Sequence, residues 1–181
     1  MQKEINKAIE VLRRGGTILY PTDTIWGIGC DAKNEKAVGK IFTLKRRDER
    51  KALISLVCNK KMIDEYTTAN HLQISISATP TTVIYQNVNG LATNLIAEDK
   101  TAAFRISTDT FCRKLVTEFG APIVSTSANI SDEEIPKQFS EITDEIKNNV
   151  DYIVNLRKKE IMTSPSKIIL INEDGSIKKI R

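Results

Sequence analysis

Short runs rich in β-branched and aromatic residues alternate along this chain with segments whose apolar residues recur at helical spacing. Residues 5–12 place apolar side chains on one helical face, and residues 17–20 form a strand candidate that Pro21 ends. Near the other end, Asp174-Gly175 marks a tight reversal between apolar runs at 166–171 and 177–180. Helices between strands, followed by a terminal hairpin, predict an α/β domain whose sheet is mixed rather than purely parallel.

The same periodicities and the turn residues predict the remaining elements. Asp109 is a natural N-cap for a helix at 110–119 that Gly120 ends. Residues 87–94 have the composition of a surface loop. We expect further helices from about residue 34 into a basic cluster at 44–51, at 60–67 and at 139–148, and further strands at 52–57, 82–85, 102–106, the start of 121–131, and 152–154.

Nothing in the composition divides the 181 residues, so we expect a single domain over residues 1–181. Hydrophobic residues make up 40% and charged residues 28%, which argues against a disordered chain and favours a globular one. No apolar run reaches the length of a membrane span, and the N-terminal segment is too charged for a signal peptide. We therefore expect a cytoplasmic protein that has no membrane partner.

Charge and cysteine content narrow the classes of function. The formal net charge of +4 suits an anionic substrate or a nucleic acid without selecting between them. Cys30, Cys58 and Cys112 lie far apart, and no Cys-x-x-Cys or Cys/His cluster is present to hold zinc. We expect reduced thiols and no tightly bound metal.

The stretch at 17–32 places polar residues and glycines directly after a strand candidate. Its Thr-Asp-Thr sequence at 22–24 would bring exposed donors and acceptors to the end of the strand. Gly27 and Gly29 would allow a turn or the close approach of a ligand. The alternative is a loop whose glycine spacing has no function.

Three later features could also form a polar site. The basic cluster at 44–51 precedes a strand, although such clusters are also typical of a solvated helix end. Arg105 lies in the apolar run AAFRI, where its guanidinium needs an anionic ligand, a structural ion pair or an edge position. The hydroxyl and amide side chains at 125–129 could bind a ligand at a strand end, or could each serve a turn or an N-cap.

Taken in order, these segments resemble the YrdC/Sua5 family, the threonylcarbamoyl-AMP synthases that supply the activated group for modifying an adenosine in tRNA. The resemblance rests on YPTDTIWGIG at 20–29, Lys45 and Arg47, AFRI with Arg105, STSAN at 125–129, Pro165-Ser166 and Arg181. It implies a twisted mixed sheet flanked by helices, with a central basic cavity. The chain departs from the family pattern in having Ala-Thr-Pro at 78–80 instead of Pro-Gly-Pro, Asp132 instead of a glycine, and no glycine near Arg181.

The family reaction joins L-threonine, bicarbonate and ATP into threonylcarbamoyl-AMP and releases pyrophosphate. By this resemblance, Mg²⁺ arrives with ATP as part of the substrate. The resemblance assigns ATP to Lys45, Arg47, Lys51, Thr101, Asn129 and Arg181. It assigns threonine to Thr22, Thr24, Arg105, Ser127 and Ser166, with Arg105 holding the carboxylate in a bidentate geometry that lysine could not reproduce.

Covalent catalysis is not expected from these residues. The only histidine, His71, lies in a weakly patterned segment, and Cys30, the best candidate nucleophile, has no visible base. The cationic residues suit positioning and electrostatic stabilisation of a leaving phosphoryl group instead.

The resemblance also implies partners and alternatives. The proteins of the t6A transferase complex would accept the product, and tRNA or double-stranded RNA is a further partner to test. One alternative is a double-stranded-RNA-binding relative without synthase activity, for which binding would fall steeply with salt. Another is a relative that handles carbamoyl phosphate in hydrogenase maturation, but this chain has no acylphosphatase-like or zinc-finger segment.

Overall fold

The computed structural model describes residues 1–48, 52–68, 79–172 and 176–180. The predictions at Lys51, His71, Asp174-Gly175 and Arg181, and the first residue of the 78–80 departure, lie outside the described residues. No helix in these described ranges combines the length and the apolar character needed to cross a membrane.

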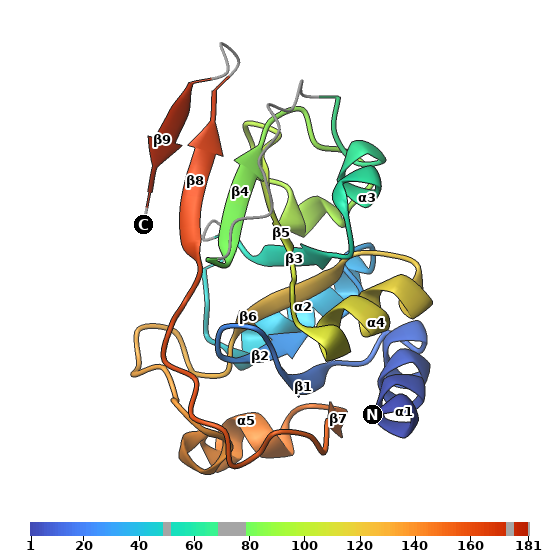
Figure 1. The fold of residues 1–181 in the computed structure, drawn as a ribbon, viewed down its shortest axis with the longest axis vertical. Helices are drawn as coiled ribbons and strands as arrows, with labels where there is room; N and C mark the ends of the chain where they lie inside the picture. The colour runs from blue at the N-terminus through green and yellow to red at the C-terminus, as the bar shows by residue number, and fades with distance from the viewer. Residues whose placement is uncertain (49–51, 69–78, 173–175, 181) are drawn as a thin grey trace.

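Helices and strands alternate through most of the described chain, as predicted (Figure 1). The first half contains α1 (Gln2–Arg13), β1 (Ile18–Pro21), β2 (Trp26–Gly29), α2 (Glu35–Leu44), β3 (Ile54–Val57), α3 (Lys60–Asp64) and β4 (Thr81–Tyr85). The second half contains the 3₁₀ helix η1 (Thr93–Leu95), β5 (Ala102–Ile106), α4 (Thr110–Phe119), β6 (Ile123–Ser127), the 3₁₀ helix η2 (Phe139–Glu141), α5 (Asp144–Asn148), β7 (Tyr152–Ile153), β8 (Lys167–Ile171) and β9 (Ile177–Lys179).

Side-chain caps explain where α2 and α4 begin. Asn34 Oδ1 accepts a hydrogen bond from the Ala37 amide at 3.1 Å at the start of α2. Asp109 Oδ1 accepts one from the Cys112 amide at 2.8 Å at the start of α4. Gly120 ends α4 in the left-handed conformation, at φ +81°. The predicted cap and stop of this helix are confirmed.

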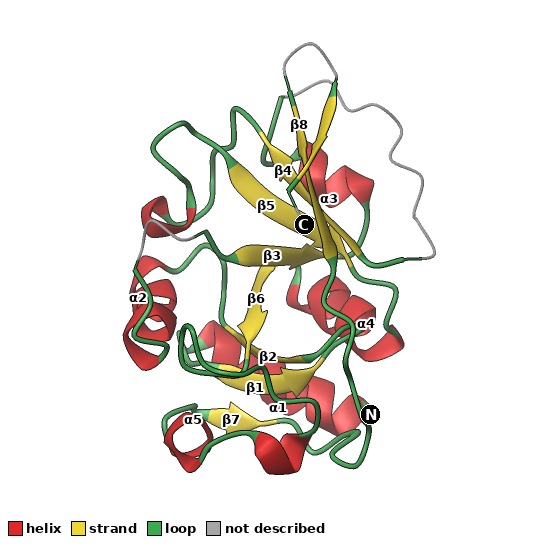
Figure 2. Cartoon of the chain, turned by 90° about the vertical axis from the view of Figure 1, so that its left-hand side faces the viewer, coloured by secondary structure: helices red, strands yellow, loops and turns green. Residues whose placement is uncertain are grey.

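The strands form one twisted mixed sheet in the order β7-β1-β2-β6-β3-β5-β4-β8-β9 (Figure 2). β3 and β5 run parallel, as do β4 and β8, whereas β6 runs antiparallel to both β2 and β3. β8 and β9 form the expected antiparallel hairpin at one end. The α/β fold with a mixed sheet is confirmed, and the order brings β6 of the second half between β2 and β3 of the first.

The two faces of the sheet pack against different helices. Leu56 and Ile123 belong to a buried cluster with α1 and α4, whereas the adjacent residues Val57 and Val124 belong to a cluster with α2. Because side chains alternate along a strand, Arg105, paired with Leu56, projects on the α1/α4 face. Polar side chains from several central strands thus point to the same side of the sheet.

The stretch at 26–29 is a buried strand, where a turn or loop had been expected. Gly27 and Gly29 alternate with Trp26 and Ile28, which pack in the α2-side cluster. A Cβ at position 29 would collide with the carbonyl oxygen of Val124, so the glycine allows β2 and β6 to pair closely. The strand was missed because glycine is typical of turns, and only the neighbouring strands reveal the close packing.

Two further expectations were wrong. The threonines at 22 and 24, expected to be exposed, are 1% and 5% exposed, and their hydroxyls bond to each other within the β1–β2 connection. The helix expected at 139–148 is divided into η2 and α5, and Thr143 starts α5 as an N-cap by accepting a hydrogen bond from the Ile146 amide. Helical periodicity continued across this break in the sequence and concealed it.

Candidate functional site

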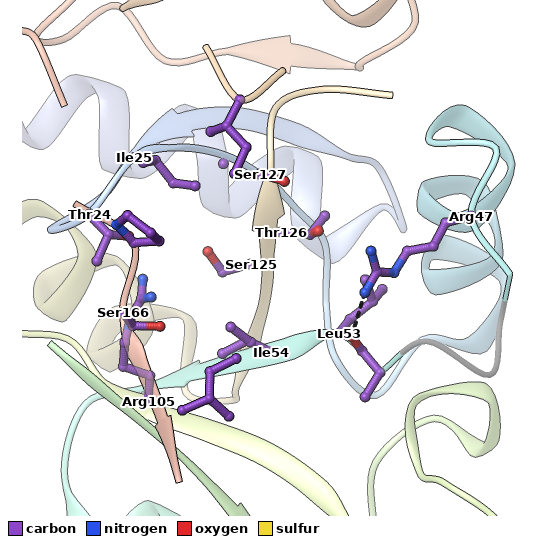
Figure 3. Close-up of a pocket in the computed structure, with 15 residues that line it drawn as sticks. Thr24, Ile25, Arg47, Leu53, Ile54, Arg105, Ser125, Thr126, Ser127 and Ser166 are labelled. Carbon is purple, nitrogen blue, oxygen red and sulfur yellow. Dashed lines mark hydrogen bonds between the residues drawn. The ribbon is translucent and has the colours of Figure 1, made fainter. Parts of the chain in front are cut away.

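A cleft of about 160 Å³ opens on the α1/α4 side of the sheet, and its lining residues come from several separate segments (Figure 3). None of the described lining residues belongs to α1 or α4. Five of the predicted site residues meet here, namely Thr24, Arg47, Arg105, Ser127 and Ser166. Figure 3 shows Arg47 on one side and Thr24, Arg105 and Ser166 on the other, with Ser125 and Thr126 between them.

Arg105 is the buried cation of this cleft. Its Nη2 donates to Asp23 Oδ1 at 3.1 Å, and the two side chains are 4% and 6% exposed. Arg105 Nε and Asp23 Oδ2 are buried, and neither has a hydrogen-bond partner among the described residues. The structural ion pair is therefore present, but it uses only part of the hydrogen-bonding capacity of the guanidinium.

Thr22 and Thr24 form a directed pair beside Arg105. Thr22 Oγ1 donates to the Ile25 carbonyl at 2.7 Å and lies 3.0 Å from Thr24 Oγ1. Because the single proton of Thr22 is used at Ile25, Thr24 must donate to Thr22. Thr24 lines the cleft and can offer only lone pairs there, whereas Thr22 does not line it.

The end of β6 and the segment before β8 supply the other hydroxyls. Ser125 and Ser127 line the cleft from β6. Ser166 lies in the connection between β7 and β8, and its Oγ is 2.8 Å from Oγ1 of the buried Thr82 on β4. Hydroxyls from segments that are far apart in sequence thus line the same cleft, and the bond to Thr82 ties Ser166 to β4.

Arg47 forms the opposite side of the cleft, just beyond α2. Its Nη2 donates to the Ala52 carbonyl at 3.0 Å, as the dashed line in Figure 3 shows. The side chain is half-buried, and this burial lowers the pKa of its guanidinium, an effect that the Asp132 carboxylate opposes. The basic cluster thus brings a cation to the cleft at Arg47.

Lys45 and Asn129, both assigned to ATP by the resemblance, do not line the cleft. Lys45 Nζ donates to the carbonyls of Ser127 at 2.6 Å and Asn129 at 2.5 Å. Burial, followed by the positive charge of Arg47, lowers the pKa of Lys45 to about 7. Asn129 Nδ2 donates to the Glu133 carbonyl at 2.8 Å, so both side chains make internal bonds.

Thr101 also lies outside the cleft lining. Its Oγ1 donates to Asp99 Oδ1 at 2.7 Å, and its carbonyl accepts from the Ala97 amide at 2.9 Å. The segment that it anchors, residues 94–99, lines a second hollow of about 550 Å³ together with Ala52. Ala52 lines both hollows, so Thr101 supports a surface that borders the cleft.

The thiols offer no activated nucleophile at this cleft. Burial raises the pKa of both Cys30 and Cys112 above the ordinary value for a thiol. Within the described ranges, no cluster of three His, Cys, Asp or Glu side chains could hold a metal ion.

Sequence reasoning missed two parts of the site. It treated Asp23 only as a polar residue at the end of a strand and did not foresee its ion pair with Arg105, because that pair joins residues 82 positions apart. It also missed the apolar lining, which consists of Ile25, Leu53, Ile54, Ile135 and Ile168. The apolar runs marked several of these residues only as strand positions, and no local signal shows which side of a strand meets a cleft.

Comparison with known proteins places the chain in a family. The family model Sua5_yciO_yrdC, described as "Telomere recombination", matches residues 10–181. A protein of Methanocaldococcus jannaschii named putative threonylcarbamoyl-AMP synthase is 34% identical, over 97% of this chain and 86% of that protein. A Hahella chejuensis protein named threonylcarbamoyl-AMP synthase is 34% identical, over 91% of each chain.

Solved structures share the fold. The crystal structure of P. abyssi Sua5 complexed with L-threonine matches all of this chain with a TM-score of 0.85 at 20% identity, and this chain spans 54% of its length. The crystal structure of E. coli YciO matches with a TM-score of 0.86 at 22% identity, covering 100% of this chain and 89% of that one. With the family model matching nearly its whole length, this chain belongs to the Sua5/YciO/YrdC family.

Proposed function

We propose that this protein is an L-threonylcarbamoyladenylate synthase, which forms threonylcarbamoyl-AMP and pyrophosphate from L-threonine, bicarbonate and ATP. The observation that carries the proposal is the meeting of Arg105, Arg47 and a wall of hydroxyls in one cleft. Relatives that match nearly the whole chain bear the synthase name, which supports the same activity here. The product would serve N6-threonylcarbamoyladenosine (t6A) modification of tRNA.

In this proposal, threonine binds on the Arg105 side of the cleft. The unused guanidinium donors of Arg105 would take the carboxylate as charge-assisted hydrogen bonds. Thr24, whose own proton is directed to Thr22, would accept a hydrogen bond from the ammonium or the hydroxyl of the substrate. Ser127 and Ser166 would complete the binding of the amino acid, and Thr22 would act by orienting Thr24.

ATP binds on the Arg47 side in the same proposal. Arg47 would contact the phosphates, together with Lys51 and Arg181, and Mg²⁺ would enter with the nucleotide. Thr101 and Asn129 would support the nucleotide side through the segments that they hold. The chemistry then needs no covalent intermediate with the protein, because cations placed around the leaving pyrophosphate stabilise its developing charge.

The reaction has two bond-forming steps. The amine of threonine, once deprotonated, combines with bicarbonate to give a carbamate and releases water. A carbamate oxygen then forms a bond to the α-phosphorus of ATP as the bond to pyrophosphate breaks. We propose a cytoplasmic location and transfer of this product to the t6A transferase complex.

Incubation of the purified protein with ATP, bicarbonate and threonine tests the proposal, with pyrophosphate release and threonylcarbamoyl-AMP measured in parallel. Both products should form in equal amounts, and neither should form when threonine is omitted. Absence of product combined with salt-sensitive binding of double-stranded RNA would refute the synthase and favour the RNA-binding alternative. Pyrophosphate release that requires carbamoyl phosphate, and neither bicarbonate nor threonine, would favour the relative that handles carbamoyl phosphate in hydrogenase maturation.

A further inference from the structure

Lys45 is among the largest fully buried side chains of the protein, at 1% exposure. Its Nζ lies 2.6 Å from the Ser127 carbonyl oxygen, 2.5 Å from that of Asn129 and 3.4 Å from Asn129 Oδ1. Within the described part of the chain, no carboxylate forms an ion pair with it. A buried ammonium without an acid is costly, and here it is compensated by uncharged oxygen atoms.

These contacts use all the donors of the side chain. An ammonium has three protons, and three oxygen atoms surround this one. The side chain therefore has no N–H donor left for a ligand in the cleft. The main chain of Lys45 adds a further bond, since its carbonyl accepts from the Ser131 amide at 2.8 Å. Lys45 therefore holds the 127–131 segment from both its side chain and its backbone.

The position of Lys45 connects the two sides of the cleft. It directly follows α2 and stands two residues before Arg47, while Ser127 ends β6 across the cleft. The Asn129 carbonyl lies beyond the last residue of β6, so sheet pairing does not fix it, and the lysine does so instead. If the Ser127 carbonyl lost this bond and its peptide group rotated, the Ser127 hydroxyl that lines the cleft would move as well.

We propose that Lys45 is a positioning residue, which sets the placement of Ser127 relative to Arg47 and makes no contact with the ATP phosphates. This inference rests on the proposed function for its substrates. Loss of the ammonium should release the 127–131 segment and weaken threonine binding, although the lysine itself never touches threonine. If Lys45 instead contacted the ATP phosphates, its substitution would weaken ATP binding and leave threonine binding unchanged.

The test compares Lys45→Met with Lys40→Met in the full chain. Lys40 is a matched control because it lies on α2, is exposed, and donates to the Gly15 carbonyl at 3.0 Å far from the cleft. Threonine binding without ATP and ATP binding without threonine are measured separately by calorimetry. Lys45→Met should weaken threonine binding by about tenfold, since the loss of one well-placed hydrogen bond from Ser127 to the substrate costs on that order. Lys40→Met should leave both affinities unchanged.

Amide hydrogen exchange supplies a readout that is independent of substrate. The Ala128 amide bonds to the Trp26 carbonyl and the Ser131 amide to the Lys45 carbonyl, so both report on this segment. Both should exchange faster in Lys45→Met than in Lys40→Met, while the β1 amides stay unchanged. Unaltered exchange, or loss of ATP affinity with threonine affinity intact, would overturn the positioning role. Wild-type protein that binds neither substrate would refute the proposed function, while the exchange result would still decide whether Lys45 holds the segment.

Discussion

The two sides of the cleft differ in how far their polar groups are already bonded. On the Arg105 side, the guanidinium is paired with Asp23, and the Thr24 proton is directed to Thr22. On the Arg47 side, the guanidinium is half-buried and bonds to a backbone carbonyl at the cleft edge. The first side is preorganised for a small ligand of fixed shape, whereas the second can adapt to a larger one.

This difference predicts opposite responses to substitution. A change on the Arg105 side should act through geometry, so even a variant that keeps the charge should fail. A change on the Arg47 side should act through charge and leave the binding of the small substrate intact.

Arg47→Ala should abolish turnover, with kcat/KM for ATP lowered by about a thousandfold or more, because a cation facing the leaving phosphates is lost. Threonine binding measured without ATP should remain at the wild-type level, and the fold should stay intact by circular dichroism. Arg46→Ala is the matched control, since Arg46 is exposed and paired with Glu145 at 2.9 Å. Full activity in Arg47→Ala would refute its assignment to the phosphates.

Arg105→Lys should lower kcat/KM for threonine by about a hundredfold, because lysine keeps the charge but cannot reproduce the planar fork. The KM for ATP should change little. Arg157→Lys is the control, since Arg157 also pairs with acids, Asp109 at 2.8 Å and Glu160 at 2.6 Å, but lies outside the cleft lining. Wild-type kinetics for Arg105→Lys would show that only charge matters on this side.

Thr22→Val should raise the KM for threonine by about tenfold, because Thr24 loses the acceptor that fixes its proton. Urea unfolding should also show a modest loss of stability, since the Thr24 amide loses its bond to Thr22. Thr43→Val removes an exposed hydroxyl that donates to the Gly39 carbonyl and should affect neither measurement. An unchanged KM would mean that Thr24 does not depend on Thr22 for its orientation.

The last prediction concerns the pH dependence of stability. Burial, and then Arg47, lower the pKa of Lys45 from 10.5 to about 7 in the folded chain. Between these two values the unfolded chain binds more protons, so this residue makes stability rise with pH, by up to about 1 kcal/mol per pH unit above pH 7. Urea titrations at pH 7, 8 and 9 measure this slope, which should be smaller in Lys45→Met. Equal slopes in the two proteins would contradict the shifted pKa.

Much of the fold could be predicted because its signals are local. The apolar runs that became β3 and β5 and the Asp109 cap of α4 were each recognised from neighbouring residues alone. β2 escaped prediction because Gly27 and Gly29 are explained only by the strands beside it. The division of residues 139–148 escaped because a regular apolar pattern spans the break.

The candidate site could be predicted as a set of residues but not as a set of contacts. The family resemblance named Thr24, Arg47, Arg105, Ser127 and Ser166 as site residues, and these five line one cleft. The inward direction of Lys45 and the pairing of Asp23 with Arg105 depend on how β6 and β5 pack against segments about 80 residues away. A sequence shows that a lysine is basic, but not that its ammonium faces carbonyl oxygens.

The glycine at position 27 helps to set how much space the cleft offers to a ligand. Gly27 lines the cleft with bare backbone, and a Cβ there would lie 3.2 Å from Ser125 Oγ. The absence of a side chain at Gly27 therefore keeps this part of the cleft open, and a single substitution would reduce the space. We expect alanine at this position to narrow the cleft beside Ser125 while leaving the polar side chains of the lining in place.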